Sequence, residues 1–205
     1  MQDVFIKIPK DVIYDTDDYT SYKNLLLTYF YFKRDFNNQI TTSMSLICQE
    51  LHMPFGRSSS PGYQTLTYLK QFISEGIFSF VPRLQCLSPD QITRSSLFTL
   101  NFIPPEPPSS NFVPLTLHEM NTFQAYLLSN EVNIRTDKLF RIYLYIKATI
   151  RNNTPLFISG STIRSLAKVG AQTAQDILDI LEDAELIVST SENNYKIMEK
   201  SLDKN

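Results

Sequence analysis

The sequence has few of the residues on which disulfide, metal and phosphate chemistry usually depend. It contains two cysteines, two histidines and five glycines among 205 residues. Cys48 and Cys86 do not make a disulfide framework for a chain of this size, and we expect both to be reduced. Five glycines leave little room for a glycine-rich phosphate-binding loop, and no such motif occurs. We therefore do not expect nucleotide hydrolysis on a phosphate loop.

The two histidines also fall outside the usual catalytic and zinc-binding patterns. His52 lies four residues after Cys48, and Cys86 with His118 completes a Cys2His2 count. The spacings match no zinc finger or ribbon, so we expect no metal. Neither histidine belongs to a recognisable pair of nucleophile and base. We expect a protein that is not an enzyme and holds no cofactor.

Long hydrophobic runs are missing as well. The strongest apolar run, residues 25–32, lies between Lys23 and Lys33 and is far too short to span a bilayer. The first residues, MQDVFIKIPKDV, contain acids and a proline and do not form a signal peptide. We therefore expect no membrane partner and a cytoplasmic location.

The chain is rich in bulky apolar residues, and its charge is unevenly spread. Apolar residues make up 42%, including 14 Phe and 11 Tyr, which is enough for large cores. The net charge of −2 argues against a globally basic nucleic-acid coat protein. Residues 131–170 nevertheless carry a net +5 and residues 171–205 a net −5. This asymmetry is compatible with a local basic footprint, although solvated faces give similar blocks.

A proline-rich segment divides the chain. The segment IPPEPPSSNF, residues 103–112, holds four prolines and two serines within ten residues. This composition favours a semi-rigid extended linker. We predict a first domain at 1–103, a linker at 104–111, a second domain at 112–200 and a frayed tail at 201–205.

Helix and strand signals follow the same order in both halves. The first half predicts a strand at 5–8, helices at 19–36, 43–51 and 60–75, and strands at 40–41, 77–81 and 97–103. The second half predicts a strand at 112–115, helices at 116–128, 136–151, 161–168 and 173–183, an extended segment at 154–158 and a hairpin at 186–198. The expected capping residues are Ser43, Ser60, Thr116 with Glu119, and Thr136, and Ser161 is expected to begin its helix.

Similar residues recur at similar offsets in the two halves. The run YFYFK that starts at Tyr29 reappears as YLYIK at Tyr143, an offset of 114. Gln64 and Thr65 match Gln172 and Thr173 at an offset of 108. The smaller second offset means that the first copy carries extra residues, which fall in its loop at 54–63. We interpret the chain as a tandem repeat of one unit.

A turn between two short helices, followed by a hairpin, resembles the winged helix-turn-helix. The resemblance rests on this order, on FIKIPKDVI before the aromatic helix and on TLTYLKQFISEGIFSF after the turn. The expected fold is α+β and mainly helical, with two tandem winged helix-turn-helix domains. Two such units resemble replication initiators of plasmids and mobile elements of Gram-positive bacteria. The resemblance implies sequence-specific binding of double-stranded DNA and recruitment of replication proteins, with transcriptional regulation as the other role.

The helix at 60–75 of the first half is the main candidate for DNA contact. Leu66, Leu69 and Phe72 recur at helical spacing, so one face packs inward. The polar side chains opposite them can donate to phosphate oxygens or to base edges. Arginines of the loop in the following hairpin can reach the backbone or the minor groove, or remain solvated. The candidate contacts are Arg57, Ser59, Gln64, Thr65, Thr67, Tyr68, Lys70, Arg83 and Arg94.

The corresponding helix of the second half carries four acids, Asp176, Asp179, Glu182 and Asp183, which would repel phosphates. The candidate contacts there are Arg164, Lys168, Gln172, Thr173 and Gln175. We expect the first domain to read sequence and the second to grip the DNA backbone or pair with protein. The alternative is a protein-interaction module, such as a replisome organiser or an assembly adaptor, without DNA contact. A homodimer is compatible with the aromatic helices around Tyr29 and Tyr143, and so is burial between the two halves.

Overall fold

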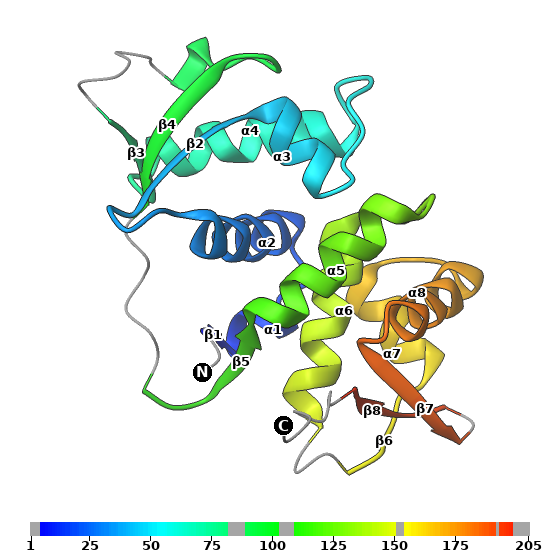
Figure 1. Ribbon diagram of the computed structural model, residues 1–205. Helices are drawn as coiled ribbons and strands as arrows, with labels where there is room; N and C mark the ends of the chain where they lie inside the picture. Colours follow the sequence, from blue (N-terminus) through cyan, green and yellow to red (C-terminus); the bar gives the residue numbers. More distant parts are fainter. Residues whose placement is uncertain (1–4, 82–88, 103–108, 151–153, 192, 199–205) are drawn as a thin grey trace.

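The computed structural model describes residues 5–81, 89–102, 109–150, 154–191 and 193–198. The fold is α+β and mainly helical (Figure 1). The expected linker is described only from residue 109 onward, and the expected tail at 201–205 lies outside the described residues.

The first half combines helices with a three-stranded antiparallel sheet. The long helix α2 (Asp18–Lys33) is followed by β2 (Gln39–Ser43) and by the helix pair α3 (Met44–Glu50) and α4 (Pro61–Ser74). The strands β3 (Phe78–Phe80) and β4 (Leu97–Phe102) then form a hairpin, with the short 3-10 helix η1 (Pro89–Gln91) between them. The strand order is β2-β4-β3.

The second half repeats this arrangement. It begins with β5 (Phe112–Thr116), α5 (Leu117–Ser129) and the long helix α6 (Thr136–Thr149). The strand β6 (Leu156–Phe157), the helix pair α7 (Gly160–Ala167) and α8 (Ala171–Asp183), and the hairpin of β7 (Ile187–Ser191) and β8 (Asn194–Ile197) follow. The strand order, β6-β8-β7, corresponds to that of the first half. Element order and sheet order therefore repeat together, as the sequence repeat predicted.

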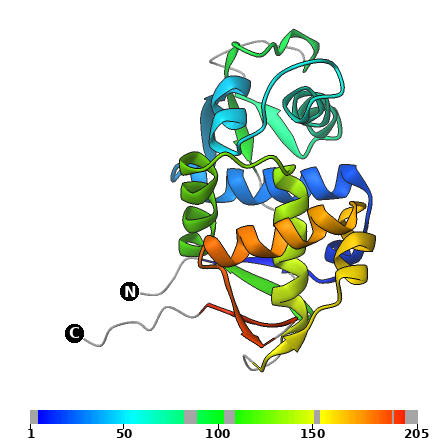
Figure 2. The same ribbon diagram turned by 90° about the vertical axis from the view of Figure 1, so that its right-hand side faces the viewer.

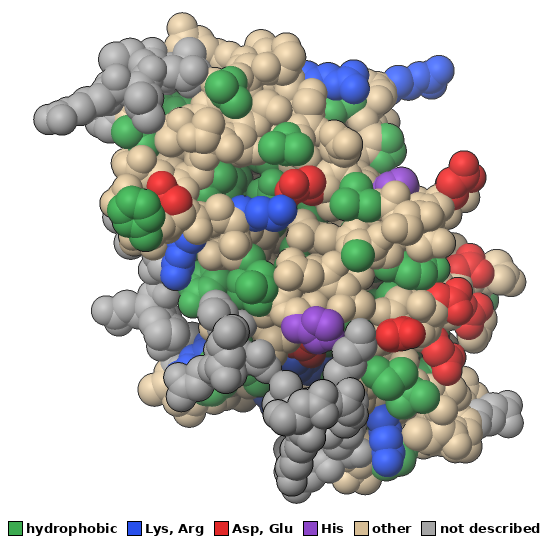
Figure 3. All heavy atoms as spheres, viewed as in Figure 1, with side chains coloured by type: hydrophobic (Ala, Val, Ile, Leu, Met, Phe, Trp, Pro, Cys, Tyr) green, Lys and Arg blue, Asp and Glu red, His purple; other side chains and the backbone are tan. Residues whose placement is uncertain are grey.

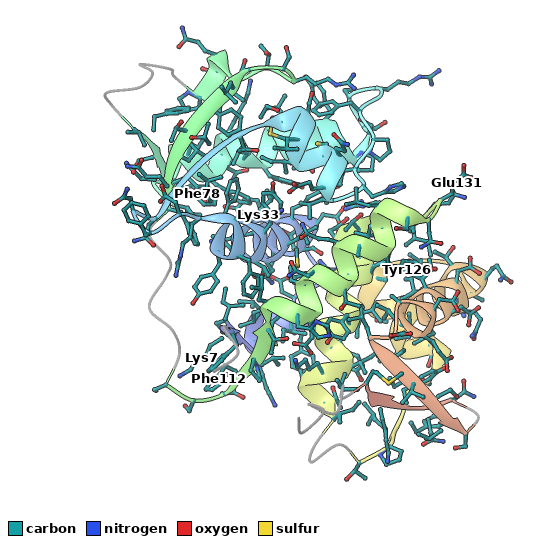
Figure 4. All side chains as sticks on the ribbon, viewed as in Figure 1. Lys7, Lys33, Phe78, Phe112, Tyr126 and Glu131 are labelled. Carbon is teal, nitrogen blue, oxygen red and sulfur yellow. The ribbon has the colours of Figure 1, made fainter. Side chains whose placement is uncertain are left out.

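The first strands of the two halves pair with each other. The strand β1 (Phe5–Pro9) runs antiparallel to β5, and the central residue of each strand, Lys7 and Pro114, lie opposite one another. An approximate two-fold relation between the strands passes through this pair. The ammonium of Lys7 lies 4.5 Å from the ring centre of Phe112, on the outer face of the sheet (Figure 4). The N-terminal strand of the predicted first domain is thus part of a sheet with the second half.

Other parts of the predicted first domain also pack on the second half. The short helix α1 (Asp11–Tyr14) contacts α6, and α2 contacts α6 as well. Figure 2 shows α2 and α6 crossing in the middle of the molecule, with α3, α4 and their sheet on one side. Buried apolar residues of both halves belong to one continuous core. The long aromatic helices α2 and α6 are buried on several faces because they form this junction.

Polar contacts reinforce the junction. The guanidinium of Arg135, at the start of α6, forms ion pairs with Asp18 at 3.0 Å and with the buried Asp137 at 2.9 Å. The hydroxyl of Thr136 donates to the backbone oxygen of Leu51 at 2.6 Å, which ties α6 to the end of α3. The side chain of Ser21 on α2 donates to the backbone oxygen of Asp137 at 3.1 Å.

Two of the predicted helix caps are confirmed. The hydroxyl of Ser43 accepts from the amide of Leu46, at the start of α3, at 3.2 Å. At the start of α5, Thr116 and Glu119 form a reciprocal capping box, with bonds of 3.2 Å and 2.7 Å. Both sites combine a hydroxyl at the N-cap with extended backbone, as capping requires.

Two predicted caps are wrong, and one helix begins earlier than expected. Ser60 is at the N-cap of α4, but its hydroxyl accepts from the amide of Gly56 instead of from the helix. Thr136 is the first residue of α6, and its hydroxyl bonds to the other half. The helix α7 begins at Gly160, with Ser159 as its cap, one residue before the expected start at Ser161. In the first two cases a loop or a distant backbone oxygen satisfies the hydroxyl, which local sequence does not reveal.

Candidate nucleic-acid interface

The helix pair α3–α4 is closely packed at its turn. The amide of Gly62 in the first turn of α4 donates to the backbone oxygen of Pro54 at 3.2 Å. A Cβ atom at Gly62 would lie 2.8 Å from the backbone oxygen of Met53 and 3.0 Å from the ring of Phe55. Only glycine permits this approach, so the position of α4 relative to the turn depends on Gly62.

One face of α4 is open to solvent. The residues Tyr63, Thr67, Lys70 and Ser74 recur at spacings of four and three, which places them in one row along the helix. Tyr63 is 45% exposed, Thr67 and Ser74 are exposed, and Lys70 is partly buried. The ammonium of Lys70 donates to the backbone oxygen of Asp90 at 3.3 Å. We call these four residues the open row of α4. The row has one cation and no carboxylate, and the hydroxyls of Thr67 and Ser74, which donate to backbone oxygens one turn back at 3.0 Å, can still accept hydrogen bonds.

Two exposed arginines belong to segments that flank the helix pair. Arg57 lies in the turn before α4, where its backbone oxygen accepts from the amide of Ser60 at 2.8 Å. The guanidinium of Arg94 lies 5.1 Å from the ring centre of Phe55 in the same turn. The backbone oxygen of Arg94 accepts from the amide of Ser45 on α3 at 2.9 Å. Basic side chains are visible at this end of the molecule in Figure 3.

The hairpin loop of the first half is only partly an exposed wing. Ile92 is buried in the core, and η1 packs against α4. The segment from 89 to 96 therefore lies along the helix pair and brings Arg94 beside the turn. Arg83, the other arginine expected in this loop, lies outside the described residues.

Several of the side chains predicted to face DNA point elsewhere. Thr65 is completely buried, and its hydroxyl contacts the backbone oxygen of Pro61 at 2.8 Å and the sulfur of Met53 at 2.9 Å. The prediction that Thr65 contacts DNA is therefore wrong. Thr65 follows the polar pattern of the helix, but a hydroxyl satisfied within its own turn is easily buried.

Gln64 and Tyr68 lie at the edge of the interface, on the side that faces α2. The amide oxygen of Gln64 accepts from the hydroxyl of Tyr22 at 3.1 Å. The ring of Tyr68 packs against Tyr22 and Tyr19, with ring centres 5.1 and 5.5 Å apart. Both residues are partly exposed, whereas Ser59 is fully exposed in the turn. The sequence pattern did not identify Tyr63, which belongs to the open row.

In the second half, Arg164 and Lys168 are exposed on and just after α7. They line a shallow hollow together with Ser161, Ser165 and Val169. The ammonium of Lys138 donates to the backbone oxygen of Lys168 at 3.4 Å. Among the described residues of this half, the exposed cations therefore lie beside α7 and not on α8.

The surface of α8 is acidic, and the side-chain amides of its two glutamines donate hydrogen bonds to carboxylates of the same helix. Gln172 donates to Asp176 at 2.8 Å and Gln175 donates to Asp179 at 2.7 Å, while Thr173 is partly buried. Figure 3 shows acidic side chains gathered over α8. Tyr126 of α5 lies close enough to α8 that its pKa is raised by burial and by the charge of Asp183 (Figure 4). An amide that donates to a carboxylate one turn away has less freedom to pair with a base edge.

Three of the seven basic residues in the block at 131–170 are engaged inside the molecule. Arg135 forms ion pairs at the junction, and the buried Arg141 donates to two backbone oxygens. Lys147 pairs with Glu119. The excess of cations in this block is therefore not a continuous DNA footprint, because the junction and the core of the second half consume three of them.

Two further features of the first half are a buried thiol and a hollow beside α2. Burial raises the pKa of the Cys48 thiol to about 12, which leaves it protonated and unreactive at neutral pH. A hollow of about 350 Å³ lies beside α2, β2 and α3, where Lys33 projects (Figure 4). Glu50 in this hollow is bonded to Tyr29 at 2.7 Å and to Lys33 at 3.1 Å, so its charge is satisfied. Among the described residues, no group of three or more His, Cys, Asp or Glu could hold a metal ion.

Comparison of the chain with protein-family models, with curated proteins and with solved structures finds no significant match. Within the part of the chain that the structure describes, no helix is both long and apolar enough to cross a membrane.

Proposed function

We propose that this chain is a tandem winged-helix protein that binds double-stranded DNA in a sequence-specific manner. The observation that carries the proposal is the open row of α4, which lacks a carboxylate and belongs to a helix pair flanked by Arg57 and Arg94. Arginines of this kind bind phosphate oxygens, and hydroxyls and amides on an exposed helix reach base edges. The helix pair followed by a hairpin, with strand order β2-β4-β3, supports the winged-helix assignment.

The two halves have different roles in this proposal. The acids of α8 would repel phosphates if this helix entered a groove, so we assign base reading to α4. Arg164 and Lys168 beside α7 can still hold the DNA backbone. The continuous apolar core and the ion pair between Arg135 and Asp18 hold the two halves together, and in this proposal the protein meets DNA as one body. The biological role that we propose is initiation of plasmid or mobile-element replication, with transcriptional regulation as the second role.

A binding experiment with paired charge reversals tests the proposal. We would measure affinity for DNA from the region upstream of the gene, or from the replication origin, by fluorescence anisotropy over a range of salt concentrations. Wild-type protein is expected to bind specifically, with affinity that falls steeply as salt increases. The double variant Arg57→Glu with Lys70→Glu should weaken binding much more than Arg164→Glu with Lys168→Glu. Equal losses in both variants would contradict the division of roles.

The second candidate function is that of a protein-interaction module, such as a replisome organiser or an assembly adaptor. The acidic surface of α8 favours it, because Asp176, Asp179, Glu182 and Asp183 suit a basic protein surface better than DNA. An adaptor of this kind would show no specific, salt-dependent DNA binding in the same experiment. The measurement thus separates the two functions.

A further inference from the structure

A tyrosine behind α4 controls one of the side chains at the edge of the interface. Tyr22 lies on α2, is completely buried, and donates its hydroxyl proton to the amide oxygen of Gln64 on α4 at 3.1 Å. Gln64 itself is partly exposed. The contact joins a side chain of the interior to one that reaches the surface.

The ring of Tyr22 is held from two sides. The guanidinium carbon of Arg135 lies 5.2 Å from its centre, and the ring of Tyr68 lies 5.1 Å away. Arg135 is fixed in turn by its ion pairs with Asp18 and Asp137. Because Arg135 belongs to the second half, that half helps to determine where the Tyr22 hydroxyl points.

In the hydrogen bond between Tyr22 and Gln64, the tyrosine hydroxyl is the donor. A buried hydroxyl without an acceptor is costly, and among the described residues Gln64 supplies the only acceptor recorded for Tyr22. Burial also raises the pKa of Tyr22, which keeps its proton available for donation. This bond engages one of the two lone pairs of the Gln64 amide oxygen and turns that oxygen toward the interior. Its amide nitrogen donates to no oxygen in the part of the chain that is described.

We propose that Tyr22 is a positioning residue that determines base preference by fixing the orientation of the Gln64 amide. A glutamine with a freely rotating amide recognises adenine through two bonds, since it accepts from N6 and donates to N7. With its oxygen turned toward the buried hydroxyl of Tyr22, Gln64 presents its NH2 group to DNA, which favours the acceptors of guanine (O6 and N7) or thymine (O4). This inference rests on the proposed function and names a determinant of its specificity.

The test is a binding selection from random DNA with wild-type protein, Gln64→Ala and Tyr22→Phe. Gln64→Ala should lose the preference at one base position and thereby identify it. At that position the wild-type protein should prefer guanine or thymine. Tyr22→Phe keeps the ring and its packing but frees the amide oxygen, so preference there should shift toward adenine by about five-fold or more. The matched control is Tyr29→Phe, which removes a buried hydroxyl from the same helix where it bonds to Glu50 and should leave the preference unchanged.

A second measurement tests the positioning without DNA. The side-chain amide signals of Gln64, assigned by their absence in Gln64→Ala, should shift in Tyr22→Phe and stay unchanged in Tyr29→Phe. Unchanged Gln64 signals in Tyr22→Phe would overturn the positioning role, even if no variant binds DNA. If the signals shift but Tyr22→Phe keeps the wild-type base preference, the specificity role is wrong. If the signals shift and the wild-type protein selects no DNA at all, the proposed function fails and takes the specificity role with it.

Discussion

The guanidinium of Arg141 on α6 donates to the backbone oxygen of Asp17, the N-cap of α2, at 2.6 Å. Arg141 is only 4% exposed, and a second nitrogen of the same group donates to the backbone oxygen of Leu166 at 2.9 Å. One side chain therefore connects the long helix of the second half to α2 of the first half and to α7. Burial lowers the pKa of Arg141, and the charges of Asp137, Asp18 and Asp15 oppose this shift in part.

Removal of this group should weaken the whole molecule. Arg141→Met keeps much of the aliphatic stem but leaves the two backbone oxygens without their donor, and we expect a loss of about 3 kcal/mol in the free energy of unfolding. Because one apolar core spans both halves, wild-type protein should unfold in urea in a single transition. Arg164→Met, an exposed arginine on α7, is the control and should change stability by less than about 0.5 kcal/mol. A similar effect of both substitutions would contradict the role of Arg141.

A pH dependence is expected from Glu119. Burial would raise the pKa of this carboxyl, but the charge of Lys147 and hydrogen bonds from Lys147, Tyr143 and Thr116 outweigh burial and hold the pKa below its usual value. The folded protein therefore favours the ionised form. The stability from Glu119 is present above its unfolded pKa, about 4.3, and is lost as pH falls through the folded value.

The variant Glu119→Gln tests this contribution. It should lose about 2 kcal/mol at pH 7, because Lys147 then stays partly buried without its partner. It should also lose less stability than wild type when the pH falls from about 5 to about 3. Urea unfolding over this range measures both effects. Glu131→Gln, at an exposed carboxyl, is the control and should lose stability with falling pH as the wild type does. If Glu119→Gln lost stability as steeply as the wild type, the pH dependence of stability would belong to other groups.

Two threonines in α4 should separate stability from DNA binding. Thr65→Val removes a hydroxyl that is bonded in the core, and we expect a loss of about 1 kcal/mol in stability with unchanged DNA affinity of the folded protein. Thr67→Val alters an exposed hydroxyl in the open row and should weaken DNA binding by about five-fold while stability changes little. Urea unfolding curves measure the stability of both variants, and fluorescence anisotropy measures their DNA affinity. A larger effect of Thr65→Val on DNA affinity would reverse our placement of the interface.

Much of the local structure was predictable from local signals. The apolar spacing of Leu66, Leu69 and Phe72 identified the inner face of α4, and all three are buried. Gly76, expected to end this helix, has a φ of 76°, a conformation that glycine adopts without a steric penalty. The capping box of Thr116 and Glu119 lies within four consecutive residues, so its geometry depends on neighbours alone.

Several of the errors concern groups whose partners are distant in the sequence. Thr136 was expected to cap its own helix but bonds to Leu51, 85 residues away. Arg135 and Arg141 belong to the basic block of the sequence. In the structure, Arg135 forms an ion pair and Arg141 a hydrogen bond with the first half. The pattern of polar residues also could not distinguish Thr65 from Thr67. Each side chain carries a methyl group and a hydroxyl, so its burial depends on what packs beside the helix.

The sequence by itself determined the order of the helices and strands, their repetition and the contrast between an acid-free row on α4 and the acids of α8. These follow from periodicity, capping and charge, which act over a few residues. Only the tertiary structure decided that β1 pairs with β5 and that Tyr22 holds Gln64. Antiparallel pairing and buried hydrogen bonds satisfy whichever partner the packed core brings near, and no local pattern records which one that is.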